Sequence, residues 1–166
     1  MKNIIFVDLD ETLIHTFMPF WGETPTKDAE TVSLSGPTGK EEEYQTALRQ
    51  GALHFLQILR NLGDVYILTA ATKDYANAMN RHFGLGFIKG QIYSREDVQS
   101  GQADPKYFGD GAVYLYDNLP RHENRSKIIF LRPLGNVNYV QVKEFYNNRT
   151  AAFTHEEIKE LVSNIK

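Results

Sequence analysis

Two aspartates, Asp8 and Asp10, follow directly on the short apolar run Ile-Ile-Phe-Val at residues 4–7. Such a run predicts a buried strand, and the ligand sites of open α/β sheets lie at the carboxyl ends of their strands. Two carboxylates at this spacing repel each other, and a bound cation would relieve that repulsion. Oxygen ligands suit Mg²⁺, which commonly takes one or two carboxylates together with a substrate phosphate.

The same pair of carboxylates can divide a phosphoryl transfer between them. One carboxylate can attack phosphorus and form an aspartyl phosphate. The other can protonate the leaving oxygen and later activate water. The alternative is that Asp8 and Asp10 only cap a turn, and an Asp-x-Asp pair taken alone favours that interpretation.

Two later apolar runs also end in groups suited to phosphate chemistry. Residues 65–68 lead into Thr-Ala-Ala-Thr at 69–72, where a hydroxyl and free backbone N–H groups can face an anion at a helix start. Residues 113–116 lead into Asp117 and Asn118, whose oxygens can bind a metal. Three strand ends with compatible chemistry favour one phosphate site over three unrelated turns.

Lys106 lies between the two later runs, and its ammonium group can offset the charge of a phosphoryl group and of the carboxylates. Each of these assignments has a structural alternative. Thr72 is a good helix N-cap in any case, and Lys106 can be an ordinary exposed lysine. Asp117 and Asn118 can simply form a turn.

The composition of the 166 residues argues against several classes of protein. The chain has no cysteine, which excludes disulfides, thiolate catalysis and cysteine-ligated zinc. Its net charge of −3 and pI near 5.9 argue against a broad basic surface for nucleic acid. The first apolar run is too short for a signal peptide, and no stretch reaches the ~20 apolar residues of a membrane helix. We therefore expect a cytoplasmic protein without a membrane partner.

Strands that alternate with helices predict an α/β fold with a central parallel sheet. The expected strands are short, continuous runs rich in β-branched and aromatic residues, at 4–7, 65–68, 113–116 and 128–131. Continuous apolar runs are typical of strands that helices cover on both faces. The expected helices follow the leucines of residues 53–62, the N-cap Thr72 and the capping-box pattern at residues 154–157.

Two segments depart from this alternation. Residues 16–48 contain a turn at 35–39 between β-like segments, which predicts a hairpin inserted after the first strand. Residues 84–111 are rich in loops, with a short strand at 90–93. The length suits one core, so we expect residues 1–166 to form a single domain. Helices on both faces of the sheet would make it three-layered, α/β/α, and an insertion of about a hairpin is too short for a large cap domain.

Together these segments resemble the HAD superfamily of phosphatases. Residues 8–15, Asp-Leu-Asp-Glu-Thr-Leu-Ile-His, are similar to its first motif, and most similar to the branch that contains the small phosphatases of the RNA polymerase II C-terminal domain and the NLI-interacting-factor-like proteins. Most other HAD phosphatases carry glycine in place of Glu11. Residues 48–51 resemble the stretch before the branch's first helix. Residues 67–76 resemble its second motif, and residues 116–120, Tyr-Asp-Asn-Leu-Pro, are similar to its fourth.

The resemblance implies an HAD-like (Rossmannoid) fold, a Mg²⁺ cofactor, Asp8 as nucleophile and Asp10 as general acid and base. The implied catalytic residues are Asp8, Asp10, Thr69 and Lys106. The implied phosphate-binding residues are Leu9, Thr12, Thr69, Ala70 and Lys106. The implied magnesium ligands are Asp8, Asp10 through its carbonyl, Asp117 and Asn118. Lys89 is the alternative to Lys106, whose surroundings do not closely match the branch.

The implied activity is Mg²⁺-dependent hydrolysis of a phosphomonoester through an aspartyl phosphate. Because no large cap is expected, the site should be open, which suits a phosphate displayed on a protein or on a polynucleotide end. The alternatives are a phosphatase of a small phosphomonoester such as a nucleotide, and a binding module that kept the fold and lost turnover. The presence of both Asp8 and Asp10 favours an enzyme.

Overall fold

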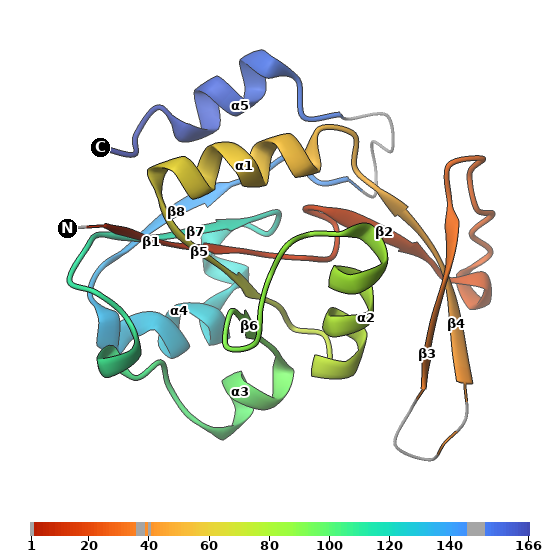
Figure 1. The fold of residues 1–166 in the computed structure, drawn as a ribbon, viewed down its shortest axis with the longest axis horizontal. Coiled ribbons are helices and arrows are strands. Elements are labelled where there is room, and N and C mark those ends of the chain that lie inside the picture. The colour runs from red at the N-terminus through yellow and green to blue at the C-terminus, as the bar shows by residue number, and fades with distance from the viewer. Residues whose placement is uncertain (1, 36–38, 40, 146–151) are drawn as a thin grey trace.

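The computed structural model describes residues 2–35, 39, 41–145 and 152–166. At its centre lies a parallel five-stranded sheet in the order β6–β5–β1–β7–β8 (Figure 1). The strands are β1 (Asn3–Val7), β5 (Gly63–Leu68), β6 (Ile92–Tyr93), β7 (Val113–Asp117) and β8 (Val137–Gln141). This architecture confirms the predicted α/β fold with a central parallel sheet.

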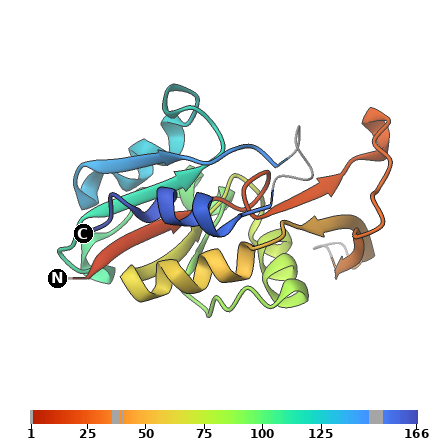
Figure 2. The same ribbon diagram turned by 90° about the horizontal axis from the view of Figure 1, so that it is seen from above.

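Helices cover both faces of the sheet. Successive side chains of β1 point to opposite faces, so β1 contributes to an apolar core on each side. Ile5 and Val7 belong to one apolar core, and Ile4 and Phe6 belong to the other. The first core includes side chains of α1 (Ala52–Leu62), α2 (Lys73–Phe83) and α5 (His155–Val162), and the second those of α3 (Arg95–Ser100) and α4 (Arg125–Leu131). Figure 2 shows α5 lying beside α1 above the sheet. None of the described helices is long and apolar enough to cross a membrane.

The apolar run at residues 128–131 is not the predicted strand, because it forms the second half of α4. Phe130 and Leu131 are buried on one side of that helix. A four-residue apolar run does not distinguish a strand from a buried helical turn. The sheet is completed instead by β8, an edge strand whose polar residues, such as Asn138, concealed it.

The loop-rich segment at residues 84–111 contains the predicted short strand, observed as β6, and an unpredicted helix, α3. A capping box made by Ser94 and Asp97 begins α3. That pairing was a readable sequence signal for a helix start.

The predicted insertion is an antiparallel sheet in the order β2–β4–β3, one strand larger than a hairpin. Its strands are β2 (Ile14–Phe17), β3 (Glu30–Ser35) and β4 (Glu41–Leu48), with the short 3₁₀ helix η1 (Pro19–Trp21) after β2. It stands at one side of the molecule next to α2 (Figure 1). Most of the turn predicted at 35–39 lies outside the described residues.

The parallel register brings the ends of three adjacent strands together. Val7 of β1 is opposite Ile67 of β5 on one side and Tyr116 of β7 on the other. The residues that follow, or end, these strands therefore share one edge of the sheet. They include Asp8 and Asp117, which are 109 positions apart in the sequence.

Candidate active site

Three charged side chains meet at this edge of the sheet. The Nζ atom of Lys127 donates hydrogen bonds of 2.7 Å to Oδ1 of Asp8 and of 2.7 Å to Oδ2 of Asp117. The side chains are 7%, 8% and 1% exposed, respectively. Lys127 belongs to the first turn of α4, which follows β7 in the chain. One buried ammonium group thus joins the residues at the ends of β1 and β7.

Burial and mutual charge set the ionisation of this group. Burial raises the pKa of Asp8 to about 7, while Lys127 opposes that rise and Asp117 adds to it. Burial alone would lower the pKa of Lys127, but the negative charges of Asp8 and Asp117 outweigh it and raise that pKa. Lys127 therefore stays charged, and Asp8 changes its charge near neutral pH.

Asp10 is held by a residue of α2. Its Oδ1 atom accepts a hydrogen bond of 2.7 Å from the hydroxyl of Tyr75. Burial raises the pKa of Asp10 to about 6, although the hydrogen bond from Tyr75 lowers it. A carboxyl group with a pKa in this range can both give and take a proton near neutral pH.

The turn after β1 is fixed by its own backbone and by Thr12. The Leu13 N–H donates to the Leu9 carbonyl at 2.8 Å. The Thr12 hydroxyl lies 3.0 Å from Oδ2 of Asp8 and 3.3 Å from the Oδ1 atom of Asn118. Thr12 thus contacts both the carboxylate of Asp8 and the amide of Asn118. Leu9 is a core residue that is 1% exposed. Only the backbone of Leu9 can take part in phosphate binding.

The end of β5 supplies the predicted threonine. Thr69 is 1% exposed, and its Oγ1 atom accepts a hydrogen bond of 3.1 Å from the Ala71 N–H. Because the hydroxyl oxygen accepts there, its hydrogen can be donated to an anion. The carbonyl of Ala70 accepts a hydrogen bond of 2.9 Å from Nε of Arg95. Thr72 caps α2 by accepting from the Tyr75 N–H, as predicted.

The donor set at this edge fits a magnesium ion. Asp8 and Asp117 place two carboxylates against the ammonium group of Lys127, and Asp10 adds a third carboxylate nearby, so the site is rich in oxygen donors. Oxygen donors of this kind suit Mg²⁺. The described residues contain no group of three His, Cys, Asp or Glu side chains arranged around a metal. The predicted set does not need one, because it combines two carboxylates with a carbonyl and Asn118.

Lys106 does not join this cluster. Its side chain is 66% exposed, its Nζ lies 3.5 Å from Asp104, and it stacks over the ring of Tyr107. The alternative, Lys89, is exposed as well. The buried cation that contacts Asp8 and Asp117 is Lys127, which was not among the predicted site residues. Its signal was a lysine directly before an apolar run, 10 residues after Asp117.

A cavity of about 790 Å³ opens between the insertion and the start of α2. Asp10 and Tyr75 lie in its wall, together with Arg95 and with Trp21 of η1. Trp21 and the neighbouring Phe20 are 75% and 92% exposed. The general acid expected at Asp10 is therefore reached from a groove with an aromatic rim.

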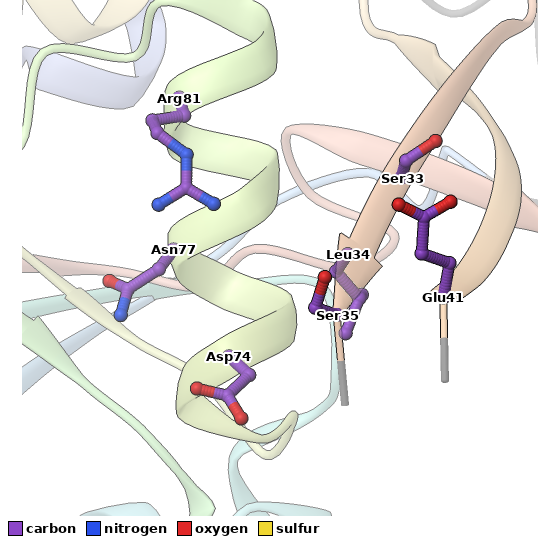
Figure 3. Close-up of a pocket in the computed structure, with 7 residues that line it drawn as sticks. All are labelled: Ser33, Leu34, Ser35, Glu41, Asp74, Asn77 and Arg81. Carbon is purple, nitrogen blue, oxygen red and sulfur yellow. The ribbon is translucent and has the colours of Figure 1, made fainter. Parts of the chain in front are cut away.

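A smaller hollow of about 330 Å³ lies farther along α2, across from β3 and β4. Figure 3 shows Asp74, Asn77 and Arg81 on the helix, with Ser33 and Glu41 on the strands. None of the predicted site residues lines it, so it is separate from the cluster around Asp8.

Residues 3–110, which are more than half of the chain, match the sequence profile of the NLI interacting factor-like phosphatases. The chain belongs to this family. It is a family of HAD-type phosphatases. The matched segment includes Asp8, Asp10 and Thr69, whereas Asp117 and Lys127 lie beyond its end.

Solved structures support the same fold for this family member. A variant of the fission yeast RNA polymerase II CTD phosphatase Fcp1, bound to beryllium fluoride, is 20% identical with a TM-score of 0.56, over 99% of this chain and 50% of that one. A second structure, of Fcp1 described as an essential RNA polymerase II CTD phosphatase, is 22% identical with a TM-score of 0.56, over 99% and 49%. The chain spans about half the length of these proteins. A search of curated proteins found no match.

Proposed function

We propose that this phosphatase hydrolyses phosphomonoesters through an aspartyl phosphate on Asp8, and that its substrate is a phosphorylated protein. The observation that carries the proposal is the buried contact between Asp8 and Lys127 beside Asp117. In this contact a carboxylate that can act as nucleophile lies against a buried cation at the strand ends. Asp10 lines the adjoining cavity.

In the first step, an oxygen of ionised Asp8 attacks phosphorus, and the bond between phosphorus and the ester oxygen breaks. Asp10 donates its proton to the departing oxygen, so the product alcohol leaves neutral. The pKa of about 6 means that Asp10 retains a protonated fraction near neutral pH. Thr12, which contacts Oδ2 of Asp8, keeps the nucleophile in place.

In the second step, water attacks phosphorus of the aspartyl phosphate, and the bond from phosphorus to Asp8 breaks. Asp10, now ionised, takes the proton from that water. Inorganic phosphate leaves, Asp8 is released as a carboxylate, and Asp10 is protonated again. The two carboxyl groups thus return to their starting states.

The phosphoryl oxygens need donors and positive charge, because the substrate brings roughly two negative charges to three carboxylates. We assign this role to Lys127 in place of Lys106, together with the Thr69 hydroxyl and the N–H of Ala70. Mg²⁺ bound by Asp8, Asp117 and the Asp10 carbonyl, with Asn118 beside them, would supply further charge neutralisation.

The form of the groove favours a macromolecular substrate. A cavity of about 790 Å³ with an exposed tryptophan at its rim suits an extended peptide around a phosphorylated side chain. The net charge of −3 disfavours a polynucleotide, whose backbone would be repelled. We also propose that residues 1–166 act as one domain, because Tyr75 and the insertion both contact the site.

The test uses p-nitrophenyl phosphate first, and then a panel of phosphopeptides, nucleotides and phosphorylated oligonucleotides. We expect turnover with Mg²⁺, highest kcat/KM on phosphopeptides, and no turnover in Asp8→Asn. Activity of Asp8→Asn equal to wild type would contradict the mechanism. A preference for oligonucleotide ends or nucleotides would contradict only the proposed substrate class.

A further inference from the structure

The hydroxyl of Tyr75 occupies a specific position in the site, in direct contact with Asp10. Tyr75 lies in the first turn of α2, where its N–H is bonded to the N-cap Thr72. Its hydroxyl is 2.7 Å from Oδ1 of Asp10. The ring packs edge-on against Tyr44 of the insertion, with centroids 5.3 Å apart. The contact with Tyr44 holds the ring of Tyr75 in place, and the ring in turn holds the hydroxyl against Asp10.

Two more hydroxyls continue the contact into the insertion. The Oγ1 atom of Thr16, in β2, is 2.5 Å from the Tyr75 hydroxyl and 2.9 Å from Oγ1 of Thr46, in β4. Thr16 is 9% exposed and Thr46 is fully buried. Three hydroxyls thus form a chain that starts between two strands of the insertion and ends on Asp10.

The direction of this chain is set at the Asp10 end. Each hydroxyl has one hydrogen to donate, and an ionised carboxylate can only accept. Tyr75 therefore gives its hydrogen to Asp10, Thr16 gives its hydrogen to Tyr75, and Thr46 gives its hydrogen to Thr16. Burial and the charge of Asp10 raise the pKa of Tyr75 far above its usual range, so it keeps that hydrogen.

We propose that Tyr75 is a positioning residue for Asp10, which holds Oδ1 and so leaves Oδ2 to exchange the proton with substrate and water. The insertion, through Thr16 and Thr46, fixes the hydroxyl of Tyr75. This inference rests on the proposed function, because it assumes that Asp10 is the general acid and base. It adds a residue of α2 and two of the insertion to the proton-transfer step.

A structural role alone would give Tyr75 a different signature. If Tyr75 only packs against Tyr44, its loss lowers stability or all rates equally. If it positions Asp10, its loss matters most where the leaving group needs a proton, because general acid catalysis is greatest there. The ratio of kcat/KM on an alkyl ester to kcat/KM on a p-nitrophenyl ester separates the two roles, because kcat/KM reports the step in which the leaving group departs, whereas hydrolysis of the aspartyl phosphate is common to both esters.

The test compares Tyr75→Phe with wild type on a phosphoserine peptide and on p-nitrophenyl phosphate, at saturating Mg²⁺. The variant keeps the ring and removes only the hydroxyl. We expect kcat/KM on the phosphopeptide to fall by about 10-fold or more, a part of the roughly 10² to 10⁴ that a general acid contributes. On p-nitrophenyl phosphate, kcat/KM should fall less. Equal losses on both esters, or no loss, would overturn the proposal.

Tyr116→Phe is the matched control. It also removes a buried tyrosine hydroxyl with a hydrogen bond of 2.7 Å, but to the Leu161 carbonyl in α5, away from Asp10. Its ratio of rates should equal that of wild type. Thr16→Val breaks the chain one step earlier, and we expect a smaller change in the same direction. If Tyr75→Phe does not fold, an unchanged ratio in Thr16→Val overturns the proposal.

The proposed function is tested separately by the same substrates. Turnover in wild type and its loss in Asp8→Asn concern the nucleophile. A change of ratio in Asp10→Asn concerns the general acid. If wild type shows no turnover, or if Asp8→Asn stays active, the proposed function is contradicted. If both results are as expected but Tyr75→Phe leaves the ratio unchanged, only the role of Tyr75 is contradicted.

Discussion

Lys127 donates a 2.7 Å hydrogen bond to Asp8 across 119 residues of sequence. The same ammonium group reaches Asp117 at 2.7 Å, so it is the only positive charge between two buried carboxylates that the described part of the chain provides there. The contact explains how two acidic residues remain at adjacent strand ends without unfolding that edge of the sheet. It also makes Lys127 the residue on which the site's charge balance depends.

We expect Lys127→Ala to lower kcat/KM by about 10²-fold or more, because fixed charges of this kind are worth several kcal/mol in a transition state. Lys127→Arg should recover little, since a planar guanidinium does not replace a compact ammonium group. Lys106→Ala is the matched control, because that lysine is exposed, and it should be nearly silent. Steady-state kinetics on p-nitrophenyl phosphate decide between the two lysines.

Lys127→Ala should also lower the free energy of unfolding. Removing Lys127 leaves Asp8 and Asp117 buried and facing each other, and breaking a buried ion pair costs about 3–5 kcal/mol. Urea denaturation without Mg²⁺ measures the loss. A Lys127→Ala protein as stable as wild type would contradict the buried ion pairs.

The two aspartates should separate in a rapid-quench experiment. Asp8→Asn should form no phosphoenzyme, because the attacking oxygen is lost. Asp10→Asn should form the phosphoenzyme slowly and hydrolyse it more slowly still. Its rate of phosphoenzyme formation should fall least on p-nitrophenyl phosphate, whose leaving group needs little protonation. A labelled phosphoenzyme that survives in Asp8→Asn would refute the assignment of the nucleophile.

Magnesium should stabilise the protein more at pH 8 than at pH 6. Burial raises the pKa of Asp8 to about 7, and a metal ligand must lose its proton before it binds. The pKa of Asp8 in the folded protein exceeds its value of about 3.9 in the unfolded chain. The metal-free protein therefore loses stability as the pH rises from the unfolded pKa to the folded pKa. Thermal melts with Mg²⁺ and with EDTA at both pH values test this, and Asp8→Asn should abolish the pH dependence of the Mg²⁺ effect.

His15 should stabilise the fold most at low pH. Its ring is 2% exposed and contacts Glu11 at 2.7 Å and Glu23 at 2.8 Å. Burial lowers its pKa, but the hydrogen bonds and charges of the two glutamates outweigh that effect, and the pKa is raised. This stabilisation is complete below the unfolded pKa near 6.5 and is lost as the pH rises through the folded value. The stability difference between wild type and His15→Gln, on the order of 2 kcal/mol, should shrink from pH 6 to pH 9.

The sequence could predict the strand-end residues because their position follows from a simple rule. Asp8, Thr69 and Asp117 each come after, or end, an apolar run, and parallel strands of one sheet end at one edge. No knowledge of side-chain packing is needed for that inference. The structure brings Asp8 and Asp117 together at that edge.

Lys127 and Tyr75 could not be placed in the same way. The run at 128–131 is too short to identify as helix or strand, and the contact of Lys127 with Asp8 depends on the helix α4 that this run helps to form. The contact of Tyr75 with Asp10 depends on how the insertion packs against α2, which no local pattern encodes. The positions of both side chains depend on contacts between segments that are far apart in the sequence.

Glu11 adopts a left-handed backbone conformation, with φ of 66°, while its carboxylate holds the ring of His15. Such a conformation costs a non-glycine residue on the order of 1 kcal/mol or more, which a glycine would avoid. The contact with His15 is one of the interactions that offset this cost. Where relatives have glycine in place of Glu11, the histidine loses this partner, so an alignment of relatives should show the residues at positions 11 and 15 covarying.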